Sequence, residues 1–488
     1  MADPDTTAPT PRETKAADTE AGTATGATTG TATGTGTADT ASEPAITYAR
    51  VFAIALPVVL SNATVPLQGA IDTAIIGNLG DATLLAAIAL GASAMAMLLG
   101  TFSFLQIGVS GTVARALGAG RPESVTNTLL RALILAFGIA SLLILFQGPL
   151  IAGVLMLFEA SAEAEAAGAR YMSLRIWGAP IELANYAFMG WFAGQERTRR
   201  LFEMQLTISL TNVTATSILV LGLGLDMEGV AIGTIIGHAA GLAWATRSAL
   251  ARSRAILPQG WRPKRAQLLD PAELGTLLRL NRDLFIRTVL LLISFAWITR
   301  MGSLQGDTIL AVNGILFEFF LVTTAGLDGF AIAAEALVGR AIGQRSVPQL
   351  RRAILISSVA AVVLACIFAL LLSIFAMDIV RLFTTSEAVR TAAEPYLLWA
   401  ALVPLAGVVA FQLDGIFVGA AAGVAMRNAM IVVAVIFLPM GQIITQAFGN
   451  HGTWAAIWLF LLLRSLLLAV QYPALEARTT RAMASPAG

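Results

Sequence analysis

The amino-acid sequence contains an internal repeat with a displacement of about 225 residues. Arg115–Gly118 (RALG) returns as Arg340–Gly343 (RAIG), and Gly80–Asp81 returns one residue out of phase as Gly306–Asp307. Further pairs at the same displacement are Gly190/Gly415, Phe192/Phe417, Gly194/Gly419, Leu157/Leu382, Phe158/Phe383 and Ser161/Ser386. A chain that carries one long pattern twice is expected to form two similar units.

The composition requires lipid as the solvent for most of the chain. Hydrophobic residues make up 57% of the sequence and charged residues 12%, about half of the usual quarter. A bilayer core needs about 20 apolar residues per helix. Twelve segments meet this need: about 51–77, 84–112, 124–150, 168–194, 202–223, 228–247, 280–302, 308–338, 351–376, 393–419, 428–447 and 453–474. We therefore predict an all-α membrane protein with twelve transmembrane helices in two pseudo-symmetric six-helix lobes, and such folds usually place a substrate site between the lobes.

The composition also argues against several classes of protein. Cys366 is the only cysteine, so neither an internal disulfide nor a cysteine metal site is expected. The net charge is +1, and no basic patch indicates a nucleic-acid partner. The glycine motifs follow no predicted strand, so they form no nucleotide-binding loop and ATP is not the energy source. We expect no enzymatic activity, no cofactor and no bound metal.

The distribution of Lys and Arg predicts the orientation of the chain. The connections that follow even-numbered helices hold eighteen of these residues, and those that follow odd-numbered helices hold at most five. The positive-inside rule then places the even connections and both termini in the cytoplasm of a multi-pass protein of the cell (inner or plasma) membrane. The predicted order is a disordered N-terminal tail 1–47, an N-lobe 48–250, a cytoplasmic linker 251–279, a C-lobe 280–475 and a C-terminal tail 476–488.

Three long segments carry a resemblance to a known family. They are LPVVLSNATVPLQGAIDTAIIGNLGD (56–81), LDGFAIAAEALVGRAIGQR (327–345) and QLDGIFVGAAAGVAMRN (412–428). These segments resemble the DinF-like branch of the multidrug and toxic compound extrusion (MATE) transporters, and the resemblance covers about 48–475. It implies a cation-coupled antiporter whose six-helix lobes enclose a V-shaped cavity that opens alternately to each side of the membrane.

One acidic residue is central to this interpretation. Asp72 lies within the first predicted span, 51–77, where a charge costs about 2.5–3.5 kcal/mol. Burial favours the neutral acid, so Asp72 can exchange a proton with the outer medium. The alternative is an acid that caps or pins a neighbouring helix. The resemblance implies that Asp72 is the proton-coupling residue and that the first helix bends near Pro57. The 225-residue displacement places the equivalent of Asp72 in the second half near Trp297, which is not an acid.

The resemblance also implies a polar network in the N-lobe, formed by Asn212, Thr216 and Thr234. Thr216 stands where archaeal members of the family have a second aspartate. A single carboxylate weakens the expectation of bound Na⁺, because a hard cation prefers several oxygens that include charge. Glu182, in the fourth span, is an additional acid that either takes part in transport or pairs with Arg175, seven residues earlier. His238, in the sixth span, either relays protons or is a hydrogen-bonded core histidine.

The C-lobe carries five charged residues within predicted spans. Asp328 and Glu335 share one face of the eighth span, because seven residues make nearly two helical turns. Lipid does not tolerate unpaired charges, so we predict one interior network in which all five residues take part. It either holds the helices together or acts as a second carboxylate site whose arginines are displaced by substrate or proton. The five residues are Arg287, Asp328, Glu335, Asp414 and Arg464.

The leading hypothesis is a secondary active multidrug exporter that works by alternating access. It exchanges protons for amphipathic, cationic, drug-like small molecules, and we expect a monomer surrounded by membrane lipid. The alternatives are a Na⁺-coupled MATE exporter and a flippase for lipid-linked precursors, which would need a large cationic groove. A receptor or channel without transport activity is disfavoured, because such a protein gains nothing from the cost of burying Asp72.

Overall fold

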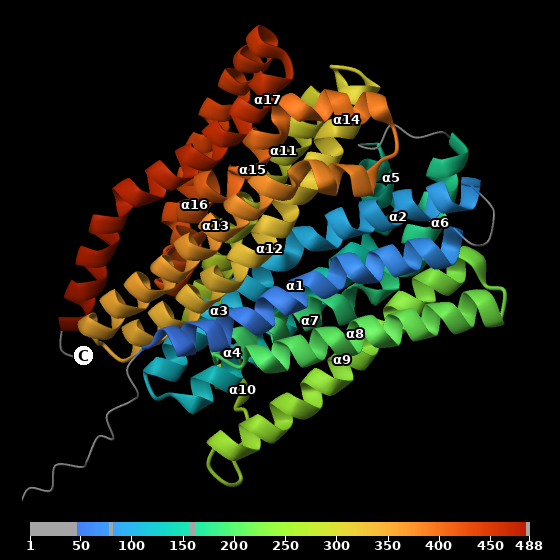
Figure 1. Cartoon of the computed structure of the whole chain (residues 1–488). Helices are drawn as coiled ribbons and strands as arrows, with labels where there is room; N and C mark the ends of the chain where they lie inside the picture. Colours follow the sequence, from blue (N-terminus) through green and yellow to red (C-terminus); the bar gives the residue numbers. More distant parts are fainter. Residues whose placement is uncertain (1–45, 78–81, 157–161, 485–488) are drawn as a thin grey trace, which may run out of the picture. The chain divides into compact units, whose positions relative to one another are not determined.

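The computed structural model describes residues 46–77, 82–156 and 162–484, which belong to one compact unit. Most of the predicted tail 1–47 lies outside the described residues, as do five residues of the repeat: Gly80, Asp81, Leu157, Phe158 and Ser161. The described part consists of helices joined by short turns and contains no strand (Figure 1). The prediction of an all-α protein is therefore confirmed.

We call the helices of the first half the N-lobe. They are α1 (Tyr48–Gly77), α2 (Ala82–Gly100), α3 (Phe104–Gly118), α4 (Pro122–Leu145), α5 (Gln147–Leu155), α6 (Ala162–Arg175), α7 (Ala179–Gly194), α8 (Thr198–Ser217) and α9 (Asp226–Ile256). Turns of 3₁₀ helix at Thr101–Ser103 and Ile176–Gly178 join α2 to α3 and α6 to α7, and a π-helical turn at Ile218–Gly222 extends α8. These pairs therefore continue as long single segments.

We call the helices of the second half the C-lobe. They are α11 (Pro271–Ser303), α12 (Asp307–Gly343), α13 (Val347–Phe383), α14 (Glu387–Ala393), α15 (Leu397–Ala401), α16 (Val403–Gly419) and α17 (Gly423–Ala484). The short helix α10 (Arg265–Leu268) lies in the linker between the lobes, and a 3₁₀ turn at Glu394–Tyr396 joins α14 to α15. Gly449, with φ of 58°, interrupts α17 and divides it into two arms.

The described helices account for twelve membrane crossings. Ten helical segments are long and apolar enough to cross a membrane, and α17 with its two arms is counted once among them. The segment formed by α6 and α7 is more polar, since it carries Arg175, Glu182 and Asn185, and it completes the twelve. This arrangement agrees with the predicted fold class.

The repeat is visible in the backbone as well as in the sequence. Three pairs of residues with positive φ are each separated by 225 positions: Gly120 (66°) and Arg345 (55°), Glu196 (60°) and Ala421 (56°), and Gly224 (65°) and Gly449 (58°). Residues other than glycine rarely adopt a positive φ. The recurrence of positive φ at matching turns shows that both lobes turn at equivalent places.

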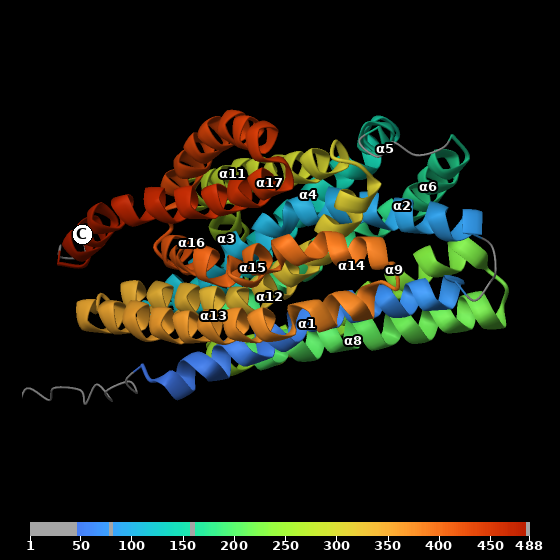
Figure 2. The same ribbon diagram turned by 45° about the horizontal axis from the view of Figure 1, so that its top comes forward.

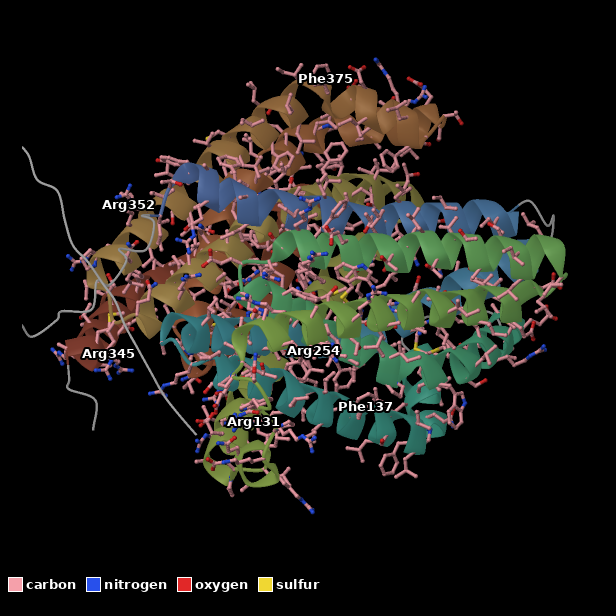
Figure 3. The ribbon with its side chains drawn as sticks, turned by 90° about the horizontal axis from the view of Figure 1, so that it is seen from below. Arg131, Phe137, Arg254, Arg345, Arg352 and Phe375 are labelled. Carbon is pink, nitrogen blue, oxygen red and sulfur yellow. The ribbon has the colours of Figure 1, made fainter. Side chains whose placement is uncertain are left out.

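The turns gather at two ends of the helical unit. We call one of them the linker end, because it holds α10 together with the turns 119–121, 195–197, 344–346 and 420–422. Figure 2 shows the C-terminal part of α17 at this end, and Figure 3 labels Arg345 and Arg352 there. Within the unit, α1 packs against α8 of its own lobe and against α12 of the C-lobe. Helices α1, α3 and α12 therefore form most of the contact between the lobes.

The helices extend past two of the predicted boundaries. The loop between the lobes spans 257–270 rather than 251–279, since α9 continues to Ile256 and α11 begins at Pro271. Asp270 caps α11 by accepting a hydrogen bond from the Ala272 backbone N–H at 2.9 Å, and proline suits the first helical position. Likewise, α17 continues to Ala484, into the predicted tail 476–488. Apolar composition marks where a helix leaves lipid, whereas the helix itself ends at its cap.

Candidate functional site

Asp72 lies in the last two turns of α1 and is half-buried. Gln68, one turn earlier on the same helix, lies within reach of the Asp72 carboxylate. The Asp72 Oδ1 atom is buried and has no hydrogen-bond partner among the described residues. No described Arg, Lys or His forms an ion pair with Asp72, so the part of the structure that we describe leaves this acid uncompensated.

Pro57 and Pro66 both lie inside α1, which continues through them as one helix. A proline cannot donate to the carbonyl four residues earlier, so Pro57 leaves the Ala53 carbonyl without its helical partner. The Thr198 hydroxyl at the start of α8 lies 3.4 Å from this carbonyl and donates to it. The predicted bend at Pro57 thus coincides with a point where α1 is tied to α8.

Close packing of α8 on α9 brings two of the predicted network residues together. A Cβ atom at Gly237 of α9 would lie 2.8 Å from the Asn212 Cβ atom, so only glycine allows this approach. The Asn212 side-chain amide donates to the Thr234 hydroxyl at 3.1 Å, and this hydroxyl donates to the Val230 carbonyl at 2.9 Å. Thr216 is buried against Gly233 of α9.

Tyr171 of α6 joins this region, although sequence reasoning did not single it out. Its hydroxyl lies beside Thr234, and the ring is close enough to Asp72, Arg175 and Glu182 to feel their charges. Gly91 of α2 makes room for it, because a Cβ atom there would lie 2.7 Å from the Tyr171 Cδ1 atom. A tyrosine in a span resembles an ordinary core residue in sequence, so only the fold identifies it.

Glu182 is paired rather than free. Arg175 donates to the Glu182 carboxylate at 2.6 Å, and both side chains are buried. His238 of α9 lies 3.7 Å from the same oxygen, and the Asn185 amide donates to the His238 backbone carbonyl at 3.0 Å. This geometry favours the pairing with Arg175 that the seven-residue spacing predicts.

Several buried oxygens of the N-lobe have no partner among the residues described here, and three of them belong to predicted site residues: Asp72 Oδ1, Asn212 Oδ1 and Thr216 Oγ1. A buried acceptor without a donor costs about 1–3 kcal/mol. A proton on the carboxylate, a water molecule or a cation would each relieve part of this cost. The N-lobe thus holds both a half-buried acid and unsatisfied neutral oxygens.

The C-lobe compensates its acid differently. The Asp414 Oδ2 atom of α16 accepts hydrogen bonds from Arg464 of α17 at 2.6 Å and from Arg287 of α11. Asp328 of α12 lies near these three charges, and the four residues are close to electrically balanced. The Arg464 guanidinium also lies 5.4 Å from the centre of the Phe460 ring, a cation–π distance.

Glu335 does not join this network, which corrects the prediction of five interacting residues. It lies beside Ser110 and Gly111 of α3, in the contact between the lobes, and Arg115 is its nearest cation. Asp328 and Glu335 share a face of α12, but seven residues also separate them by about 10 Å along the helix axis. They therefore belong to different layers of the protein.

Glu196, in the turn between α7 and α8, joins the two lobes at the linker end. It accepts two hydrogen bonds of 2.8 Å from Arg50 of the N-lobe and one of 3.1 Å from Arg340 of the C-lobe. Its side chain is only 11% exposed. We call the contact between Glu196 and Arg340 the latch. Sequence reasoning missed it, since neither position follows an apolar pattern that predicts the partner.

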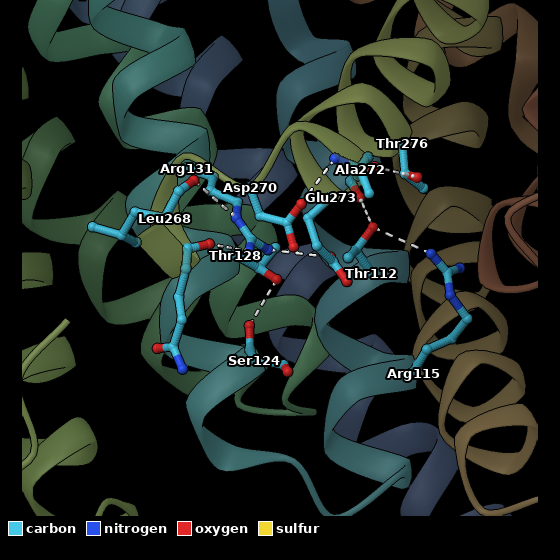
Figure 4. Close-up of polar contacts among 12 residues, drawn as sticks. Thr112, Arg115, Ser124, Thr128, Arg131, Leu268, Asp270, Ala272, Glu273 and Thr276 are labelled. Atoms are coloured by element: carbon cyan, nitrogen blue, oxygen red, sulfur yellow. Dashed lines mark hydrogen bonds and ion pairs between the residues drawn. The ribbon is translucent and has the colours of Figure 1, made fainter. Parts of the chain in front are cut away.

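The repeat equivalent of Arg340 makes a second contact between the lobes. Arg115 of α3 donates to the Gly419 carbonyl of α16 at 3.0 Å and to the Thr112 hydroxyl at 3.2 Å; Figure 4 shows the latter bond. Between the two arginines α3 and α12 approach closely, and a Cβ atom at Gly339 would lie 2.7 Å from that of Ala114. The linker end is thus closed by equivalent residues of both lobes.

The linker itself is attached to the N-lobe. Arg131 of α4 is buried and donates to the backbone carbonyls of Gln267 at 2.6 Å and Leu268 at 3.2 Å. It also contacts the Glu273 carboxylate at 3.2 Å, at the start of α11 (Figure 4). One arginine therefore ties α4 to the segment that leads into the C-lobe.

Comparison with known proteins agrees with this architecture. The MatE family profile matches residues 57–218 and 284–443, one segment in each half. The chain belongs to the MatE family. DNA damage-inducible protein F of Escherichia coli strain K12 is 34% identical over 433 residues, which cover 88% of this chain and 92% of that protein. The probable multidrug resistance protein NorM of Geobacillus kaustophilus strain HTA426 is 24% identical over 90% of this chain and 97% of its own length. This MATE protein is thus a multi-pass membrane transporter of the efflux class.

Solved structures of the family share the fold. A MATE crystal structure in the bent conformation has a TM-score of 0.80 with 18% identity, covering 89% of this chain and 97% of that chain. An outward-facing multidrug resistance MATE transporter has a TM-score of 0.76 with 18% identity, over 89% and 97% of the two chains. The resemblance to MATE proteins that the sequence motifs indicate is therefore confirmed.

Proposed function

We propose that this MATE protein exports amphipathic, cationic small molecules in exchange for protons, and that Asp72 carries the proton. The observation that carries the proposal is the contrast between the acids of the two lobes. Glu182 is paired with Arg175, and Asp414 is held by two arginines, whereas Asp72 has no ion-pair partner among the described residues. An acid in lipid that no cation neutralises is the group most readily discharged by a proton.

The polar residues around Asp72 have a supporting role in this proposal. Gln68 and Tyr171 adjust the cost of the carboxylate, while Asn212 and Thr234 keep α8 and α9 at a fixed distance. None of these side chains carries a charge that would have to move with the proton. The change of charge at Asp72 is therefore the event that distinguishes the two states of the N-lobe.

The latch and the Arg115 contact close the linker end, which we take to face the cytoplasm. Asp72 then accepts a proton from the outside, loses its attraction for a cationic substrate, and releases it. The neutral lobe reorients and returns the proton to the cytoplasm, where the renewed charge attracts another substrate. Because one proton enters for each monovalent cation that leaves, the exchange moves no net charge and is driven by the pH gradient. Each pH unit contributes about 1.4 kcal/mol, enough for about tenfold accumulation.

The test is transport by the purified protein in liposomes, with either a pH gradient or a Na⁺ gradient imposed. We expect a pH gradient alone to drive export of a cationic dye by the wild type. Asp72→Asn should insert and fold but lose this transport, because it remains neutral. Asp307→Asn, the same change at an exposed acid at the start of α12 in the C-lobe, should retain it. Normal pH-driven transport by Asp72→Asn would exclude Asp72 as the coupling group.

Coupling to Na⁺ is the second candidate, favoured by the unpartnered oxygens of Asn212 and Thr216. The same assay tests this candidate. Export driven by a Na⁺ gradient at constant pH would show that Na⁺, and not the proton, is the coupling ion. A lipid-linked precursor flippase has less support. Such a flippase needs free cations for its anionic substrate, and both Arg287 and Arg464 are engaged by Asp414.

A further inference from the structure

A groove lies on the flank of the C-lobe, between α13, α16 and the second arm of α17. Its volume is about 310 Å³, and all of its lining residues belong to the C-lobe. Most of them are apolar, and the half-exposed side chains of Val362 and Val409 lie at its edge. In a bilayer such an opening faces lipid rather than the contact between the lobes.

Gln412 contributes the one buried amide of this mostly apolar lining. Its side chain is only 4% exposed, and neither its amide nitrogen nor its oxygen has a hydrogen-bond partner among the described residues. Burying an unpaired amide costs about 1–3 kcal/mol as judged from protein mutations. Leucine has a similar size and would avoid this cost. A glutamine here is accounted for if a molecule with its own donor or acceptor occupies the groove.

The N-lobe provides an internal comparison, because the same scaffold fills this place with its own side chains. The 225-residue displacement relates Gln412 to Ala187, and it relates the lining residues Leu413, Ile416 and Ala469 to larger aromatic residues of the N-lobe. These are Phe188, Trp191 and Trp244, respectively. Phe188 and Trp191 are buried, and Phe192 links the Trp191 and Trp244 rings at centroid distances of 5.3 and 6.1 Å.

The groove continues toward the linker end. An adjacent space of about 450 Å³ shares Ile354, Ser358 and Tyr472 with it and is also lined by Arg351 and Glu476. The Arg351 side chain is 68% exposed although it donates to Glu476 at 2.7 Å. Arg345 and Arg352 lie at the same end (Figure 3). From the inside outward, the groove therefore presents an apolar surface, the buried amide of Gln412, the hydroxyls of Ser358 and Tyr472, and the Arg351–Glu476 pair.

We propose that the groove binds one glycerophospholipid of the leaflet at the linker end. An acyl chain would cover the apolar lining, an ester carbonyl would accept from Gln412, and the phosphodiester would meet Arg351. Gln412 is seven residues before the end of α16, so it lies about 10 Å inside the helix terminus. That depth suits a lipid ester beneath its head group. The Arg351 guanidinium is 68% exposed beside Glu476, and with Arg345 and Arg352 at the same end it favours a phosphodiester over a cationic substrate.

The test uses the full-length protein in nanodiscs that contain phosphatidylethanolamine with a photoreactive diazirine in one acyl chain. After illumination, mass spectrometry should find cross-links on α13 and α16 around the groove. Ala469→Trp introduces the N-lobe residue into the groove and should reduce these cross-links at least fivefold. Val470→Trp adds the same side chain at an exposed neighbour that does not line the groove, and it should leave them unchanged.

Gln412→Leu keeps the volume and removes the amide, so it should also reduce the cross-links, even if Ala469→Trp does not fold. Equal cross-linking in both tryptophan variants would overturn the proposal. So would displacement of the probe by an excess of a transported cationic dye, because the groove would then be a substrate site. Insensitivity to Gln412→Leu would refute the role of the amide as the lipid contact.

Discussion

Breaking the latch should open the linker end. Arg340→Gln removes the charge that crosses the lobes to Glu196 but keeps a long polar side chain. Glu196 retains its two bonds to Arg50, so the N-lobe side of the contact stays intact. The perturbation therefore acts at a contact between the two lobes.

The magnitude follows from the geometry of this one bond. Hydrogen bonds to charged groups contribute about 1.5–3 kcal/mol. The Arg340 side chain is 22% exposed, and solvent screening reduces the value to about 1–2 kcal/mol. Since 1.4 kcal/mol is a factor of ten, we expect the population that is open at the linker end to rise by about 5- to 30-fold. The Arg115 bond to the Gly419 carbonyl limits the change, because it still holds the lobes together.

The assay is the rate at which a buried single cysteine reacts with a polar maleimide. Ser110 of α3 is 2% exposed and lies in the contact between the lobes, so Ser110→Cys should react only when the linker end opens. The only native cysteine, Cys366, is exposed and must first be changed to serine. Arg340→Gln should raise the reaction rate in proportion to the open population.

The matched control is Arg199→Gln, which removes the same charge from a pair within the N-lobe. Arg199 is 87% exposed and contacts Glu203 at 3.2 Å on its own helix. This change should leave the cysteine reaction unaffected. An unchanged rate in Arg340→Gln, or an equal rise in both variants, would show that the latch does not hold the linker end closed.

Two further predictions concern packing and buried charge. Asp414→Asn leaves two guanidiniums without their carboxylate and should destabilise the protein by about 3–5 kcal/mol, measured as a lower thermal unfolding temperature. Adding Arg464→Met should recover part of this loss. Strictly additive losses would refute the coupling between the two residues. Gly237→Ala should push α9 away from Asn212, lower the free energy of unfolding by about 1–3 kcal/mol and reduce pH-driven transport. Gly138→Ala, whose Cβ atom would meet no atom within 4 Å, should be tolerated. Equal behaviour of the two alanine variants in the transport assay would contradict the proposed role of this packing.

The sequence predicts the fold well, because lipid imposes a strong and local rule on it. Long apolar segments specify the crossings, and the repeat at 225 residues specifies that the halves are alike. The recurrence of positive φ at Glu196 and Ala421 shows how far the likeness extends, since these two turns share no residue type. Helix ends are less predictable, because Asp270 and Pro271 fix one of them by capping and not by hydropathy.

Parts of the site can be predicted from spacing along one helix, or from the rule that buried charges such as Asp414 and Arg464 must pair. The spacing of Arg175 and Glu182 gives their pairing correctly, as seven residues keep both on one face. The same spacing misleads for Asp328 and Glu335, because a common face does not imply a common layer. Contacts between helices, such as those of Tyr171 or Glu196, depend on packing distances that a single sequence does not contain.

The two lobes have diverged in a way that bears on the mechanism. The C-lobe cluster holds two arginines and two aspartates, so adding or removing one proton there would upset a balanced set of buried charges. The N-lobe has no such balance at Asp72, where one proton changes a carboxylate into a neutral acid. In the proposed cycle this cluster therefore keeps a constant charge and serves as part of the surface against which the N-lobe moves. If Asp72 carries the proton, a duplicated scaffold would respond to the proton gradient through one of its two lobes.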